Sequence, residues 1–196
     1  EEVAANNHPT MDYYALQSAT EGTIFDYKSV DDSNDWRVKF IRKFSKEAAL
    51  AALGQIYKRH YDVVFSNGEN VSIPLAAMMT LSGRSPIHVL IGHHLSTPKK
   101  RILLKLLQSK MDKIFVYAQT QLDYAVNTLG IPKDKLVLFP FHADDTFYAP
   151  RDRKTDLEDY ICSAGLEWRD YPTLIKAVEG LALQVKLAAA SPWSKH

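Results

Sequence analysis

The segment YDVVFSNGENVSIPLAAMMTLSG (61–83) decides the fold class. Its first six residues form a short apolar run that predicts a buried strand, and NGEN (67–70) follows as a polar turn. The apolar residues at 71–81 predict a helix that ends near Gly83. A buried strand that leads through a turn into a helix is the repeating unit of a parallel α/β sheet.

The same alternation extends to both sides of this segment. A long amphipathic helix is expected at 35–58, with Ser33 or Asn34 as its N-cap. Thr120 is expected to cap a later helix that Gly130 closes. Further strands are predicted at 22–27, 86–92, 113–118 and 136–140, and a basic helix at 99–111. This order predicts a Rossmann-like, doubly wound parallel sheet, although the chain reaches a helix before its first strand.

A second βαβ unit is predicted near the C-terminus. Strand 160–164, helix 171–181 and strand 184–190 follow a polar stretch at 141–159 that is typical of a linker. One βαβ unit cannot bury both faces of its sheet. We therefore expect an N-terminal Rossmann-like domain over 1–150, its first strand missing. The linker and the truncated start of a second Rossmann-like domain are expected over 151–196.

Composition narrows the class of protein. The chain has 196 residues, of which 46 % are hydrophobic, so it can bury a sizeable core. Its single cysteine, Cys162, excludes an internal disulfide and fits a reducing compartment. No apolar run is long enough for a membrane span. These features predict a cytoplasmic protein, with membrane association as the alternative.

Positive charge is concentrated in two segments. Residues 36–59 hold seven Lys and Arg against one Glu, and residues 99–113 hold six against one Asp. The second segment is also rich in Leu, a composition that an anionic membrane surface attracts. A solvated charged face over a packed apolar face explains the pattern as well. Trp36, Phe40 and Phe44 lie at the spacing of a packed helix face, so nucleic acid is not expected as a partner.

Polar residues follow two of the predicted strands at the end where open α/β sheets bind ligands. His93 and His94 follow the strand 86–92, and adjacent residues of an extended segment point apart, so a shared metal is not expected. The strand 61–66 is followed by a polar turn that consists of Asn67, Gly68, Glu69 and Asn70. These residues could bind a hydroxyl group of an acceptor substrate, or they could form a turn without a binding role. The sequence has no carboxylate pair at helical spacing and no CxxC, so it does not predict a hydrolase or a zinc site. It also lacks the P-loop and G-x-G-x-x-G motifs, so a P-loop or dinucleotide site is not predicted.

Three stretches carry a resemblance to a known family. VLIGHH (89–94) is similar to an apolar strand that delivers a histidine to an active-site cleft. LVLFPFHADDTFYAP (136–150) is similar to a pattern of an apolar strand, Pro-Asn-Gly-Val-Asp and then Phe-x-Pro. Pro140, Asp144, Tyr148 and Pro150 have the spacing of that pattern, although Phe141-His142 replaces its Asn-Gly. Gly165, Arg169 and TLIKA (173–177) resemble the first strand, turn and helix of a donor-binding domain, with Leu166 where an arginine is common. In this order the stretches resemble retaining GT-B glycosyltransferases of the family-four type (glycosyl transferases group 1).

The resemblance implies two facing Rossmann-like domains that transfer a hexose from a nucleotide sugar to a saccharide or small-molecule acceptor, with retention and without a metal or other cofactor. It implies that His94 contacts the donor sugar, with His93 on the opposite face. It also implies a nucleotide-sugar site, formed by Gly165, Glu167, Arg169 and Ser191, with Lys195 as a further candidate. The family's paired glutamates would follow His196, so the fragment alone is expected to be inactive. Two alternatives stay open: a non-catalytic Rossmann-like binding domain, and a peripheral membrane glycosyltransferase with a lipid acceptor.

Overall fold

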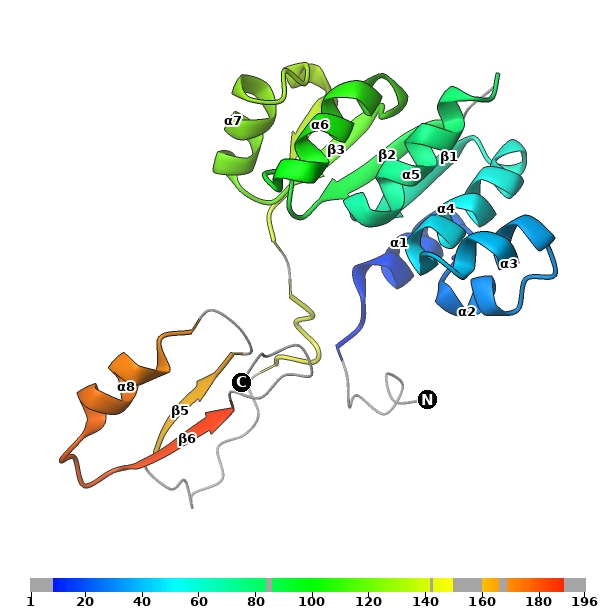
Figure 1. Cartoon of the computed structure of the whole chain (residues 1–196). Coiled ribbons are helices and arrows are strands. Elements are labelled where there is room, and N and C mark those ends of the chain that lie inside the picture. Colours follow the sequence, from blue (N-terminus) through cyan, green and yellow to red (C-terminus); the bar gives the residue numbers. More distant parts are fainter. Residues whose placement is uncertain (1–8, 84–85, 142, 150–159, 166–168, 189–196) are drawn as a thin grey trace. The chain divides into compact units, whose positions relative to one another are not determined.

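The computed structural model describes residues 9–83, 86–141, 143–149, 160–165 and 169–188 (Figure 1). The chain divides into two compact units, Glu1–Tyr148 and Ala149–His196. The sequence placed the boundary at residue 150. We describe each unit by itself.

The larger unit is built around a four-stranded parallel sheet with the order β1-β2-β3-β4 (Figure 1). Its strands are β1 (Val63–Asn67), β2 (Ile87–Gly92), β3 (Lys113–Val116) and β4 (Leu136–Leu138). Between them run α5 (Glu69–Thr80), α6 (Pro98–Leu107) and α7 (Gln119–Asn127), with the short 3-10 helices η2 (Gln108–Lys110) and η3 (Lys133–Lys135). The prediction of a parallel α/β sheet is confirmed. Among the described strands the order does not reverse, so the doubly wound arrangement stays a prediction.

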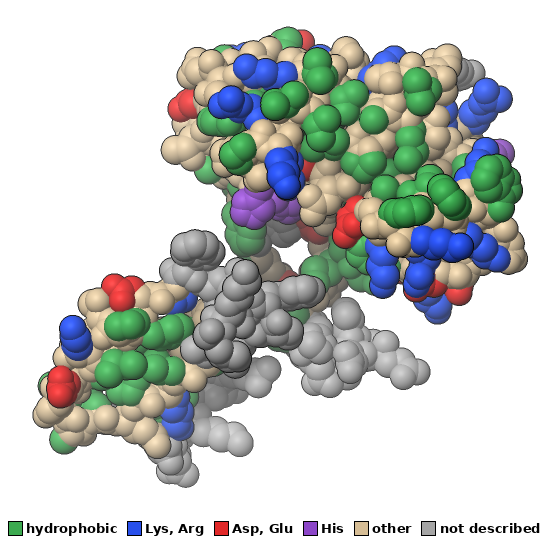
Figure 2. Space-filling view, in the orientation of Figure 1, with side chains coloured by type: hydrophobic (Ala, Val, Ile, Leu, Met, Phe, Trp, Pro, Cys, Tyr) green, Lys and Arg blue, Asp and Glu red, His purple; other side chains and the backbone are tan. Residues whose placement is uncertain are grey.

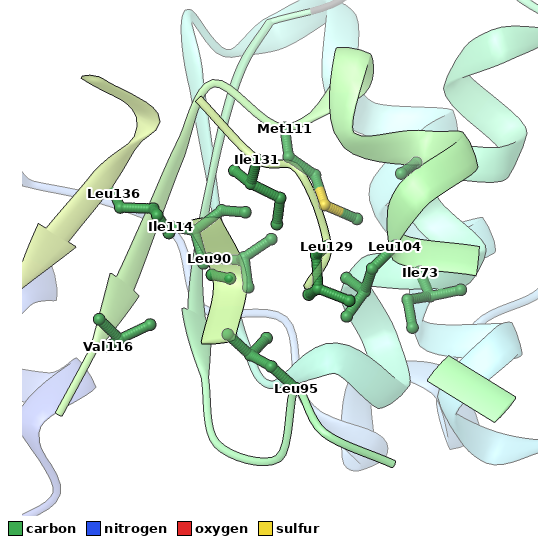
Figure 3. Packing of buried hydrophobic residues seen from close by; sticks show 12 residues of the cluster. Ile73, Leu90, Leu95, Leu104, Met111, Ile114, Val116, Leu129, Ile131 and Leu136 are labelled. Carbon is green, nitrogen blue, oxygen red and sulfur yellow. The ribbon is translucent and has the colours of Figure 1, made fainter. Parts of the chain in front are cut away.

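One face of this sheet carries the main core. Leu90 lies opposite Ile114 in the register, and Ile114 lies opposite Leu136, so the three side chains share a face. They pack with buried residues of all three crossover helices, such as Leu104 of α6 and Ala125 of α7 (Figure 3). The continuous apolar runs of the sequence therefore mark the buried strands correctly.

From residue 9 onward, four α-helices precede the sheet: α1 (Asp12–Thr20), α2 (Tyr27–Asp31), α3 (Trp36–Arg42) and α4 (Lys46–Tyr57), which η1 (Lys58–His60) extends. The strand predicted at 22–27 is wrong, because Thr23–Asp26 is irregular and Tyr27 begins α2. Asp26 is the cause: its side chain accepts the Ser29 amide at 2.8 Å and caps the helix.

The single helix predicted at 35–58 is also wrong, because the chain breaks between α3 and α4. Ser45 interrupts it, since its Oγ accepts the Ala48 amide at 3.1 Å and starts α4. Asp35, rather than Ser33 or Asn34, caps α3 by accepting the Arg37 amide at 2.8 Å.

Two further details of the larger unit bear on the predictions. Thr120 lies within the first turn of α7 and Ala118 precedes that helix, so Thr120 is not the cap. Gly130 has a φ of 70°, the left-handed conformation that glycine adopts without strain. No helix in the described part of the chain is long and apolar enough to cross a membrane.

Replacing Ser45 by alanine is expected to lower the free energy of unfolding by about 1 kcal/mol, because α4 loses its N-cap hydrogen bond. Urea unfolding followed by circular dichroism measures the change. Ser18→Ala is the matched control, since Ser18 is an exposed residue inside α1. Equal stabilities of the two variants would contradict the role of Ser45 as the helix break.

The smaller unit contains β5 (Tyr160–Ala164), α8 (Tyr171–Val178) and β6 (Gln184–Ala188), and its two strands pair in parallel. This is the βαβ order that the sequence predicts. Asp170 caps α8 by accepting the Thr173 amide at 3.1 Å. None of the described residues of this unit is buried.

Candidate functional site

The polar residues that follow β1 and β2 lie together at the carboxyl edge of the sheet. Asn67 ends β1 and pairs in register with Ile91, two residues before His93. His93 and His94 are both exposed, and Figure 2 shows histidine side chains on the surface at the lower edge of the larger unit. This is the edge at which open parallel sheets bind ligands.

The ring of His93 is held between two neighbours. Its Nε2 lies 2.8 Å from Oδ1 of Asn67, and its ring centroid lies 5.6 Å from that of Tyr117. An amide oxygen only accepts hydrogen bonds, so Nε2 donates and carries the proton. In the neutral ring Nδ1 is then an acceptor, the group that a ligand hydroxyl needs.

Glu69 ties the first turn of α5 to the loop after β2. Its Oε1 accepts the backbone N–H of His94 at 2.7 Å, and its Oε2 lies 3.2 Å from Nζ of Lys100. The residue is only 2 % exposed. Both carboxylate oxygens are thus engaged within the protein, and the position suits a negative charge at a helix N-terminus. The geometry makes Glu69 a residue that positions His94.

Gly68 joins β1 to α5 in a backbone conformation that favours glycine. Its φ of 104° and ψ of 153° belong to a region that other residues rarely adopt. A Cβ at this position would lie 3.4 Å from Cδ2 of His93. The neighbouring Asn70 is exposed in the first turn of α5.

Gln121 and a group of aromatic rings complete this edge of the sheet. The side-chain nitrogen of Gln121 donates to the His93 carbonyl at 2.9 Å, and its oxygen accepts the Tyr117 amide at 2.9 Å. The Tyr117 ring lies 6.3 Å from that of Phe139 and 5.3 Å from that of Phe141. Burial, with the charge of Asp12 as a smaller cause, raises the pKa of Tyr117.

Sequence reasoning missed Tyr117, Gln121 and Lys100. Tyr117 directly follows β3, so aligning the carboxyl ends of all predicted strands would have found it beside His93. Gln121 and Lys100 give no such signal, because their contacts are made with residues far away in the chain.

Asp144, from the motif at 136–150, has a structural role in the larger unit. Its Oδ1 accepts the Phe147 amide at 2.9 Å, and its Oδ2 accepts the Thr10 amide at 2.6 Å. These two bonds, that of Phe147 first, lower the pKa of Asp144. Tyr148 is exposed, while His142 and Pro150 lie outside the described residues.

Two of the four predicted nucleotide-sugar residues are described, both in the smaller unit. Gly165 follows β5, and the Arg169 side chain crosses it so closely that a Cβ on Gly165 would lie 2.5 Å from Arg169 Nε. The Tyr171 hydroxyl donates to the Gly165 carbonyl at 2.6 Å. Only glycine therefore allows the guanidinium to lie here. Glu167 and Ser191, like Lys195, lie outside the described residues.

A buried polar chain runs beneath the turn at Gly68. The fully buried His88 places Nε2 at 2.8 Å from Ser66 Oγ and Nδ1 at 3.0 Å from the Lys110 carbonyl. Burial lowers the pKa of His88, so the ring is neutral and Nδ1 carries the proton. Ser66 contacts Ser72 at 2.7 Å, and Ser72 donates to the Gly68 carbonyl at 2.7 Å. Ser66 is only 5 % exposed and His88 is fully buried, so we assign the serine–histidine pair a structural role.

Other candidate sites are weaker. Within the described ranges, no group of three or more His, Cys, Asp or Glu side chains could hold a metal ion. An open groove of about 450 Å³ lies beside α2 and α4, lined among others by Phe25, Ser29 and Tyr57, and includes none of the predicted site residues. No protein-family model and no curated protein sequence matches the chain.

Proposed function

We propose that the larger unit is the acceptor-binding domain of a retaining GT-B glycosyltransferase of the family-four type. The observation that carries this proposal is the group of Asn67, His93 and Tyr117 at the carboxyl edge of the sheet. Planar polar groups bind the hydroxyls of a sugar, and an aromatic ring packs against its apolar face. Such a group suits a saccharide better than a flat or strongly charged ligand.

Each residue has a distinct part in this proposal. Asn67 uses its side-chain oxygen to hold His93, so its NH₂ group is the donor that it offers to an acceptor hydroxyl. His93 accepts a hydrogen bond from a ligand hydroxyl through Nδ1. Glu69 and Gly68 set the position of the two histidines, and Asn70 lies at the margin of the site.

The donor half of the proposal rests on the smaller unit. Arg169, held over Gly165, offers a planar guanidinium that pairs with a diphosphate through two parallel hydrogen bonds. In hexose transfer the bond between the anomeric carbon and the diphosphate oxygen breaks. A bond to the acceptor oxygen forms on the same face of the sugar, and the acceptor proton leaves with the diphosphate. In the smaller unit, Arg169 takes up the charge of the leaving group. In the larger unit, His94 is the residue that steadies the reacting sugar. Glu167 and Ser191 stay candidates for the nucleotide-sugar site.

Replacing Asn67 or His93 by alanine is expected to weaken saccharide binding about tenfold, because each change removes one hydrogen-bonding group from the site. Calorimetric titration with a panel of monosaccharides, disaccharides and nucleotide hexoses measures the affinity. Binding is preferable to turnover as the readout, because it reports on the site itself.

His60→Ala is the matched control, since His60 is an exposed histidine in η1, outside the site. Failure of every saccharide and nucleotide hexose to bind would refute the proposal. An equal loss of affinity in the His60 variant would show that the ligand does not bind specifically at the carboxyl edge of the sheet. Saccharide binding with no release of nucleoside diphosphate from a nucleotide hexose would favour the non-catalytic binding domain.

A further inference from the structure

α3 presents a row of aromatic side chains to solvent. Trp36 is 74 % exposed, Phe40 56 % and Phe44 78 %. They recur every fourth residue and so share one face of the helix and of the turn that follows it, where the rings of Phe40 and Phe44 lie 5.4 Å apart. The sequence predicted that these residues pack in the core, and this prediction is wrong. A contiguous apolar surface of this kind marks an interaction site.

Basic side chains surround the three rings. Residues 36–46 contain five Lys and Arg and no Asp or Glu: Arg37, Lys39, Arg42, Lys43 and Lys46. Together with the rings they form what we call the aromatic–basic patch. Figure 2 shows Lys and Arg beside hydrophobic side chains over α3.

The cations of the patch differ in their neighbours. Arg37 pairs with Asp35 and Arg42 with Asp31, while Lys39 donates to the Asn34 side chain at 3.2 Å. No carboxylate among the described residues lies within 4.0 Å of Lys43. Lys39 and Lys43 thus offer positive charge that no carboxylate within this distance offsets.

The side of α3 opposite the aromatic–basic patch is packed in a buried cluster. Val38, on the opposite side of α3, is fully buried and packs with Val30 of α2 and Leu53 of α4. α3 therefore cannot turn its aromatic face inward without breaking this cluster. The rings keep their outward direction whatever they bind.

We infer that the aromatic–basic patch docks on the surface of an anionic lipid bilayer. Aromatic rings insert at the level of the lipid headgroups, and lysines beside them reach the phosphates. The cores of protein–protein interfaces are depleted in lysine, so rings beside Lys39 and Lys43 fit a membrane better than a protein partner. This inference goes beyond the proposed function and does not depend on it.

The test is co-sedimentation of the chain with vesicles of phosphatidylcholine alone and of phosphatidylcholine mixed with phosphatidylglycerol. We expect binding to the mixed vesicles only, weakened by added salt. The variant Trp36→Ser/Phe40→Ser/Phe44→Ser should bind about a hundredfold more weakly, because it removes the inserted apolar area. Lys39→Gln and Lys43→Gln should each cost roughly fivefold.

Controls separate this patch from other exposed apolar residues. Leu81→Ser/Leu181→Ser/Leu183→Ser removes leucines that are 90 %, 52 % and 47 % exposed, and should bind as the parent does. A second comparison variant, Ile102→Ser/Leu106→Ser, changes α6. It tests the membrane contact that the sequence suggested through 99–113. The two side chains are 61 % and 71 % exposed. Thermal melts of all variants should match the parent, since every substituted side chain is exposed.

Three outcomes would overturn the inference. The first is absence of binding to both kinds of vesicle. The second is binding that the α6 variant abolishes and the α3 variant leaves unchanged. The third is a dimer in sedimentation velocity without lipid that the α3 variant dissociates, which would assign the patch to a second copy of the chain.

Discussion

Glu69→Leu is expected to lower the free energy of unfolding by about 4 kcal/mol, the size of effect seen when one partner of a buried ion pair is removed. The change leaves the His94 amide and the Lys100 ammonium group without the carboxylate that both contact. The Lys100 side chain is 20 % exposed and so recovers part of its hydration, which keeps the loss below about 5 kcal/mol. Urea unfolding at neutral pH measures the loss.

Further variants separate the charge from the hydrogen bond at Glu69. Glu69→Gln keeps an oxygen for the His94 amide and loses the ion pair, so its cost should be smaller. A double-mutant cycle with Lys100→Met gives the coupling energy of the pair. Glu179→Gln, at an exposed carboxylate in the smaller unit, is the control. A loss in Glu69→Leu no greater than in this control would show that Glu69 does not hold the loop at His94.

His88→Leu is expected to lower stability at neutral pH by about 3 kcal/mol. The ring occupies a fully buried position, and its loss removes one buried hydrogen bond from the Ser66 hydroxyl and one from the Lys110 carbonyl. Leucine has a similar volume, so a cavity is not the main cause. Urea unfolding at a series of pH values measures both this loss and its pH dependence.

The pH dependence of His88 has a defined sign. Burial lowers the pKa of the folded-state ring below the ordinary value of 6.5, so the unfolded chain takes up a proton that the folded chain does not. The stability that the neutral ring contributes is therefore fully present above pH 6.5 and decreases as the pH falls below it. One such proton changes stability by up to about 1.4 kcal/mol per pH unit. The charge of Asp112, which accepts the His88 amide at 2.8 Å, opposes this shift only in part.

The parent should lose stability below pH 6.5 and His88→Leu should lose less, so the two curves converge. His60→Leu is the control, because His60 is exposed. A parallel course of the parent and His88→Leu curves would rule out His88 as the source. Carboxylates with a lowered pKa, such as Asp26 and Asp144, change the stability only near and below their ordinary pKa of 3.8. They therefore do not contribute to the pH dependence just below pH 6.5.

The sequence predicted the sheet well because its signal is local. Four apolar runs between turn residues became β1 to β4, since a strand buried in a parallel sheet needs a continuous apolar run. The errors lie where a single polar side chain competes with a periodic pattern. Asp26 and Ser45 cap helices, which removed a predicted strand and divided a predicted helix.

Part of the candidate site was predictable for the same reason. Asn67 and His93 directly follow apolar runs, so their place at the carboxyl edge of the sheet follows from strand order. Their hydrogen bond, and the ring of Tyr117 beside His93, depend on how neighbouring strands align, which the sequence does not state.

The sequence by itself determined the α/β class, the alternation of strands and helices from β1 onward and the edge of the sheet where polar residues gather, because these depend on residues close together in the chain. Only the tertiary structure decided that Glu69 is buried against Lys100 and that Trp36 faces solvent. Helical periodicity shows that residues share a face, but whether that face is buried depends on distant elements that pack against it. For Trp36 the cluster formed by α2 and α4 takes the opposite side of α3 and leaves the aromatic face uncovered.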